Sequence, residues 1–123
     1  MRRIEKPWGH ELIWAETSRY VGKTLFIRAG CRLSLQYHRV KDESLLVQAG
    51  ALIVLLEEDD GALVRHALKP GDTLHVSPGR RHRFEALTDC ELIEVSTPEL
   101  DDVVRVSDDY GRAPPGHEGG DPV

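Results

Sequence analysis

Residues 30–50 read Gly30-Cys-Arg-Leu-Ser-Leu-Gln36-Tyr-His38-Arg-Val-Lys-Asp-Glu43-Ser-Leu-Leu-Val-Gln-Ala-Gly50, and this stretch decides the fold. Gln36 and His38 are separated by one residue, so on an extended strand their side chains share one face while Tyr37 points to the other. Glu43 follows five residues after His38, which is far enough for the chain to turn and bring its carboxylate back toward the imidazole.

A second turn, Ser77-Pro-Gly-Arg-Arg-His82, supplies another imidazole. Together, these two stretches offer nitrogen and oxygen donors with one carboxylate, a set that suits a divalent metal with open coordination positions. A single histidine on a strand is more often an ordinary buried polar group. Unpaired polar groups inside apolar strands would, however, cost about 1 to 3 kcal/mol each. The sequence therefore predicts a metal site whose ligands are Gln36, His38, Glu43 and His82.

The spacing of glycines and ligands in residues 30–50 resembles the first motif of the cupin superfamily, with Gln36 where a histidine usually stands. Residues 71–82 resemble the second cupin motif, with Ser77 in the usual place of proline and Ala86 where asparagine is common. The departures at Ser77 and Ala86 fall at turn and supporting positions. They leave the ligand assignment unchanged.

Within the cupins, Arg-Leu-Ser-Leu-Gln-x-His at residues 32–38 resembles the cupin domain of type II phosphomannose isomerases, which is usually fused behind a mannose-1-phosphate guanylyltransferase domain. Further matching segments are residues 6–9, 82–83, 92–95, 101–105 and 109–112. That family carries additional histidines at the positions that Arg39, Val40 and Ser44 hold here. The resemblance covers nearly the whole chain up to Arg112.

Short apolar strands separated by Gly, Pro and Asp turns, with almost no helical periodicity, indicate an all-β sandwich or barrel. The resemblance makes this a single-domain cupin, a double-stranded β-helix or jelly-roll barrel with an N-terminal arm, over residues 1–112. Residues 113–123 are rich in Pro and Gly without apolar periodicity, and we expect a disordered tail there. For residues 100–110 the sequence leaves a strand and a helical turn open.

The resemblance implies a metal-dependent sugar-phosphate isomerase that interconverts mannose 6-phosphate and fructose 6-phosphate, with Glu43 and His82 as catalytic residues. Zinc is the favoured ion, with manganese, nickel or iron as alternatives. Guanidinium groups suit a phosphorylated sugar, and the candidates for binding it are Arg80, Arg81, Arg112 and Arg32, with Lys6 and Lys41 as lesser options. The general base is left open between Glu43, His75 and a metal-bound hydroxide.

Two other functions remain open at this stage. One is a non-catalytic metal-binding cupin that binds a sugar or a small acid. The other is a cupin dioxygenase, because two histidines and a glutamate can form the facial set that holds iron. The amide ligand Gln36 makes the dioxygenase less attractive.

Length and composition limit the partners. At 123 residues and 13.8 kDa the chain makes one domain, with no room for a guanylyltransferase domain. A net charge of -5 and a pI near 5.6 argue against nucleic acid or anionic membranes as partners. Two cysteines, no apolar leader and no apolar run of about 20 residues favour a cytoplasmic protein with reduced thiols.

The motif strand also raises a question of assembly. Leu33, Leu35 and Tyr37 alternate with Ser34, Gln36 and His38, so an apolar outer face would oppose a polar inner face. Burial against another sheet or another subunit would resolve this, and we predict a homodimer. On the later strand, residues 82 and 84 face one way, so Arg83 is predicted to face outward.

Overall fold

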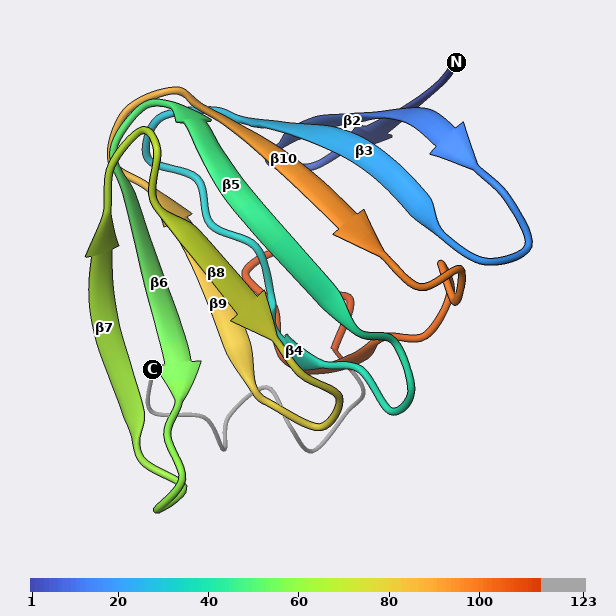
Figure 1. Ribbon diagram of the computed structural model, residues 1–123. Helices are drawn as coiled ribbons and strands as arrows, with labels where there is room; N and C mark the ends of the chain where they lie inside the picture. The colour runs from blue at the N-terminus through green and yellow to red at the C-terminus, as the bar shows by residue number, and fades with distance from the viewer. Residues whose placement is uncertain (114–123) are drawn as a thin grey trace.

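The computed structural model describes residues 1–113, which form two antiparallel β-sheets that face each other (Figure 1). The six-stranded sheet has the order β1 (Arg2–Lys6), β2 (Gly9–Glu16), β3 (Val21–Ile27), β10 (Cys90–Ser96), β5 (Glu43–Ala49) and β8 (Thr73–Val76). The five-stranded sheet has the order β11 (Val104–Ser107), β4 (Leu35–Tyr37), β9 (His82–Ala86), β6 (Leu52–Glu57) and β7 (Leu63–Leu68). No helix occurs in residues 1–113. The predicted all-β jelly roll is confirmed.

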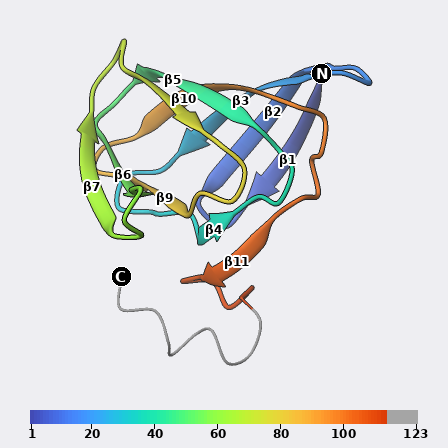
Figure 2. The same ribbon diagram turned by 60° about the horizontal axis from the view of Figure 1, so that its bottom comes forward.

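The core lies between the two sheets. Figure 2 looks into the barrel, with β1 and β2 on one side and β6, β7 and β9 on the other. Leu45 and Val47 of β5 alternate with more exposed neighbours and meet Phe84 and Ala86 of β9 inside. Each large apolar side chain buried in this way contributes about 1.5 to 3 kcal/mol. The strands therefore present their period-two apolar faces to one shared core.

The two motif turns are held together by backbone contacts. The amide of Gly79 donates to the carbonyl of His38 across 2.6 Å, so the second turn is fixed against the end of β4. Gly50 ends the first motif with a φ of 90°, and a Cβ there would collide with the carbonyl of Asp89. Only glycine fits this position, because it combines a left-handed backbone with close approach.

The predicted N-terminal arm is an integral edge of the six-stranded sheet. β1 and β2 form a hairpin with Arg2 opposite Ile13 and Lys6 opposite Gly9. Trp8, at the turn of this hairpin, is 2% exposed and belongs to the core. Its carbonyl accepts a hydrogen bond from the amide of Arg28, which holds the turn on the end of β3.

Residues 100–113 contain the strand β11, which pairs with β4 at the edge of the five-stranded sheet, so the strand alternative for this segment is the correct one. Arg83 does face away from the core, but it is only 2% exposed, because the guanidinium donates to the carbonyls of Leu33 and Ser107. Leu35 is likewise fully buried.

The apolar face of the motif strand is thus buried within one chain. Leu33 lies in the core between the sheets, and Leu35 is covered without a second subunit. Tyr37 is half-buried. The homodimer stays a prediction, and it needs a different surface.

Other predictions concern the ends of the chain and its cysteines. Cys31 and Cys90 are both free thiols, as expected. The predicted tail at 113–123 lies outside the described residues, apart from Ala113, which is 5% exposed. Among residues 1–113 there is no helix of the length and hydrophobicity that crossing a bilayer requires. The cytoplasmic location stays a prediction.

Candidate metal centre

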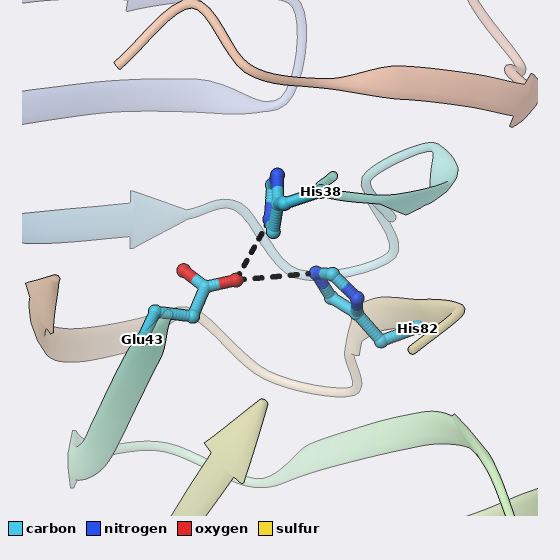
Figure 3. A group of neighbouring side chains, drawn as sticks. All are labelled: His38, Glu43 and His82. Atoms are coloured by element: carbon cyan, nitrogen blue, oxygen red, sulfur yellow. Dashed lines mark hydrogen bonds and ion pairs between the residues drawn. The ribbon is translucent and has the colours of Figure 1, made fainter. Parts of the chain in front are cut away.

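His38, Glu43 and His82 converge at one point inside the barrel (Figure 3). His38 follows β4, Glu43 begins β5 and His82 begins β9, so three chain segments each contribute one side chain. Their ligand atoms lie within 4.8 Å of one another, and all three residues are buried. Nε2 of His38 is 2.8 Å and Nε2 of His82 is 3.3 Å from Oε1 of Glu43. Ligands about 2.1 Å from a shared ion are separated by roughly 3 to 3.4 Å.

Backbone carbonyls determine which ring nitrogens face this point. Nδ1 of His38 lies 2.6 Å from the carbonyl oxygen of Asp102, and Nδ1 of His82 lies 2.9 Å from that of Arg80. A carbonyl oxygen only accepts hydrogen bonds, so both Nδ1 atoms carry protons. Nε2 is then the nitrogen of each ring that faces Glu43, and it is the nitrogen that can bind a cation. This outer support of the far nitrogen is typical of metal-binding histidines.

The residues present fit a divalent cation. Nε2 of His82 is buried and has no hydrogen-bond partner among residues 1–113. A buried polar atom without a partner is costly. A cation at this point would satisfy all three atoms. The pair of imidazoles with one carboxylate suits zinc, iron, nickel or manganese.

Glu43 is held as a carboxylate with its two oxygens in different roles. Burial opposes its charge, but His38, His82 and Lys41 hold its pKa well below the usual value. Nζ of Lys41 lies 3.5 Å from Oε2, which leaves Oε1 to face the histidines. Glu43 can therefore offer one oxygen to a metal while the other stays with Lys41.

A network of buried charges extends from Glu43 across the six-stranded sheet. Glu94 on β10 is 3.3 Å from Lys41 and 3.6 Å from Lys23 on β3, and Lys23 is 3.2 Å from Glu11 on β2. Burial and the neighbouring charge of Glu43 raise the pKa of Glu94 to about 7. Strand positions that read as ordinary surface charges in the sequence are thus inside the barrel, where they support the trio.

A cavity of about 170 Å³ opens beside the trio. His38 and Gln36 form part of its wall, together with Trp8 and Leu33. Gln36 is opposite His82 in the strand register, and its amide oxygen accepts a hydrogen bond of 2.6 Å from Ser34. Gln36 is therefore next to the trio, and its role as a fourth ligand stays a prediction.

The four predicted phosphate-binding arginines separate into two groups. Arg112 lines the cavity. Arg80 and Arg81 are directed to the hairpin between β6 and β7, where they donate to the carbonyls of Glu57 and Gly61. Arg32 is paired with Asp109, 2.6 Å away, and is not among the residues that line the cavity. The structure brings one of the four to the cavity beside the trio.

Sequence reasoning missed two groups of residues. Lys23, Glu94 and Asp102 support the trio, and Arg105 lines the cavity. A charged residue at an inward position of a strand is a signal for the first two, since Lys23 and Glu94 lie two residues from the core residues Leu25 and Leu92 and so share their face. Nothing local marks Asp102 or Arg105, because their roles depend on residues 100–113 returning to β4.

Two opposed sheets with a buried histidine, glutamate and histidine trio between them define a cupin. The family described as "Mannose-6-phosphate isomerase C-terminal" matches residues 1–108. The chain belongs to this family.

The curated relatives are larger proteins. The chain is 32% identical over 116 residues to the mannose-1-phosphate guanylyltransferase of Escherichia coli K12, and this match covers 90% of the chain and 23% of the relative. It is 29% identical over 116 residues to the xanthan biosynthesis protein XanB of Xanthomonas campestris, with 90% and 24% covered. The chain thus spans about a quarter of the length of these relatives.

Solved structures show the same fold. KdgF from Halomonas matches with a TM-score of 0.69 at 22% identity, over 82% of this chain and 91% of that one. Oxalate decarboxylase from Bacillus subtilis matches with a TM-score of 0.71 at 18% identity, over 85% and 29%. An RmlC-like cupin from Shewanella frigidimarina matches with a TM-score of 0.69 at 16% identity, over 81% and 86%.

Proposed function

We propose that this protein is a metal-dependent sugar-phosphate isomerase that interconverts mannose 6-phosphate and fructose 6-phosphate. The observation that carries the proposal is the convergence of His38, Glu43 and His82 beside a cavity whose wall includes Arg112. Membership of the mannose-6-phosphate isomerase C-terminal family supports the choice of substrate. A divalent cation and a cationic wall are the two features that such a substrate requires.

Each residue has a defined part in this proposal. His38, Glu43 and His82, with Gln36 as the fourth donor, would hold the ion. A bound divalent ion supplies Lewis acidity that polarises substrate oxygens. Oε1 of Glu43 faces the histidines, while Lys41 keeps Oε2 occupied. Arg112 retains guanidinium N–H groups beyond those it gives to Asp108, so it can still donate to a phosphate.

The proton transfer between carbons one and two needs a base near the ion. Glu11 lines the cavity and is 8% exposed. Its carboxylate lies on the inner face of β2, where it accepts a hydrogen bond from Nζ of Lys23, 3.2 Å away. Glu11 therefore joins Glu43 as a candidate base.

The test is to incubate the purified protein, loaded separately with zinc, manganese, nickel or iron, with mannose 6-phosphate and to assay fructose 6-phosphate. Turnover that a chelator abolishes and the metal restores is the expected result. His38→Ala should remove this turnover. His66→Ala, on the edge strand β7 of the five-stranded sheet, should leave the turnover unchanged. If fructose 6-phosphate is not formed with any of these four metals, the proposal is overturned.

A non-catalytic cupin that binds a sugar or small acid is the second candidate. It is favoured by one observation: Glu11, the candidate base in the cavity wall, is ion-paired with Lys23. A base held in an ion pair is a weaker proton acceptor. Tight sugar binding without turnover in the same assay would select this candidate.

A further inference from the structure

The cavity wall carries an unusual share of cations. Six of the residues that line it are basic: Arg2, Lys6, Lys23, Lys41, Arg105 and Arg112. Four of them have carboxylate partners, since Arg2 is paired with Glu16, Lys23 with Glu11, Lys41 with Glu94 and Arg112 with Asp108. The remaining two are Lys6 and Arg105. In residues 1–113 neither makes a side-chain ion pair or hydrogen bond.

Arg105 is placed toward the ligand side of β4. It is opposite Gln36 in the antiparallel register of β11 and β4, and side chains of opposed residues share one face of a sheet. Its Nε is buried without a hydrogen-bond partner in the described chain. A buried guanidinium nitrogen with no acceptor is costly, and an oxygen ligand in the cavity would satisfy it.

Lys6 and Arg112 reach the same space from the two ends of the described chain. Burial lowers the pKa of Lys6, and the charges of Lys23, Arg105 and Arg112 lower it further against the opposing effect of Glu11. Burial, and then the charge of Arg112, likewise lower the pKa of Arg105. All three cationic groups line the same cavity. An anion bound among them would relieve their repulsion.

We propose that Lys6, Arg105 and Arg112 form an anion subsite for the phosphate group of a sugar phosphate. The subsite is defined by the buried Nε of Arg105, which has no hydrogen-bond partner in residues 1–113, and by Lys6, which makes no side-chain ion pair there. Two unpaired cations match a phosphate monoester, which carries about -1.5 to -2 charges at pH 7, better than they match a single carboxylate. The choice of a sugar phosphate rests on the proposed function.

The subsite also fixes the direction in which the ligand lies. Arg105 and Gln36 are cross-strand neighbours, and Gln36 and His38 share one wall of the cavity. A phosphate on Arg105 therefore leaves the sugar ring or chain to extend along this wall toward His38. The carbonyl end of the sugar then meets the trio, and the phosphorylated end stays away from it.

Calorimetric titration tests the subsite. Inorganic phosphate, mannose 6-phosphate and mannose are titrated into the protein with a chelator present and, separately, with metal. Phosphate and mannose 6-phosphate should bind under both conditions, because the subsite does not use the metal. Arg105→Gln should weaken both by about 10- to 100-fold, the usual effect of losing a hydrogen bond to a charged group. Lys6→Met should weaken both by at least about fivefold, as a lost ion pair does.

Arg19→Gln is the matched control, since Arg19 is an exposed arginine between β2 and β3. It should leave both affinities unchanged. Unfolding curves by circular dichroism show whether each variant is folded. If Arg105→Gln does not fold, Lys6→Met still tests the subsite. Unchanged phosphate affinity in folded Lys6→Met and Arg105→Gln would overturn the subsite. Phosphate binding that requires metal, or tighter binding of glucuronate than of phosphate, would also overturn it.

These outcomes are separate from those of the isomerase assay. If Arg105-dependent phosphate binding is found without turnover, the subsite stands and the isomerase proposal fails. If mannose 6-phosphate is isomerised with equal KM by the wild type and folded Arg105→Gln, the isomerase proposal stands and the subsite fails.

Discussion

The two histidines show how much of the trio depends on groups outside it. His38 and His82 each give the Nδ1 proton to a backbone carbonyl, from Asp102 and Arg80. Each ring thereby turns the same nitrogen, Nε2, toward Glu43. The spacing of the motifs predicts that these residues meet. It does not predict the tautomers, since Asp102 is sixty-four residues from His38.

His82→Ala should abolish metal binding and leave the barrel folded. The backbone pairs of β9 with β6 remain, so the cost is that of one truncated core side chain, about 1 to 3 kcal/mol of unfolding free energy. Metal stoichiometry by mass spectrometry and chemical denaturation measure the two effects. His75→Ala, at an exposed histidine that contacts Asp42, is the control. Full metal occupancy in folded His82→Ala would contradict the assignment.

Asp102→Asn should weaken metal binding about 10- to 100-fold, as the loss of outer support for a ligand does. The carboxylate of Asp102 accepts hydrogen bonds from the amides of Arg39, Lys41 and Val40, and these lower its pKa to about 2. An amide side chain replaces one acceptor oxygen by a donor, which loosens the loop that carries His38. A chelator competition titration gives the affinity. Asp101→Asn should match the wild type.

At the scale of elements, the segment from β11 to Ala113 extends the five-stranded sheet beyond β4. The carbonyl of Ser107 accepts a hydrogen bond from Arg83, and the same segment brings Arg105 and Arg112 to the cavity. Asp109 attaches its end, since the carboxylate pairs with Arg32 at 2.6 Å and with Arg83 at 3.4 Å. One segment therefore serves both stability and the cavity.

The attachment through Asp109 should depend on pH. The hydrogen bonds from Arg32 lower the pKa of Asp109 below its ordinary 3.8. A carboxyl group with a lowered folded-state pKa stabilises the folded state above its unfolded pKa, and this contribution disappears as the pH falls through the folded one. In urea unfolding, the wild type should lose unfolding free energy between pH 7 and pH 3. Asp109→Asn should make this loss smaller by roughly 1 kcal/mol or less. An identical pH dependence in the variant would contradict this role.

The extent of sequence prediction also differs between elements. The trio was predictable because each motif is local: His38 and Glu43 stand at the two ends of one turn, and His82 ends another. Arg80 and Arg81 are predicted to bind a phosphorylated sugar, yet they are ion-paired with Glu58 and Glu57 at the hairpin between β6 and β7. The pairing of β6 with β9 brings this hairpin to the arginines, and such long-range register is not visible in local patterns.

At the scale of the whole molecule, one surface stands out as the place for a second subunit. The outer face of the six-stranded sheet exposes 46% of Trp14 and 51% of Val95. Partly buried apolar residues lie in register beside them, with Leu12 opposite Thr24 and Thr24 opposite Ile93. The ring of Trp14 lies over Gly22, so it is held flat on the sheet. A predicted homodimer would use this face.

Light scattering at micromolar concentration should therefore give a mass of twice 13.8 kDa. Trp14→Glu should shift the protein to one chain, because a buried unpaired charge at an interface is strongly unfavourable. Val64→Glu, at a 40% exposed position on β7 of the other sheet, should leave the mass unchanged. A wild-type protein with the mass of one chain would contradict the dimer.

The division of the cavity between chain segments has an evolutionary consequence. The residues proposed to hold the ion come from positions 38 to 82, whereas Lys6, Arg105 and Arg112 come from the two flanks. Mutation in the flanks can alter which molecule is recognised without disturbing the inorganic chemistry at the centre. Relatives with the same histidines and glutamate but different flanks are then expected to differ in substrate, and swapping flanks between them is a direct route to altered specificity.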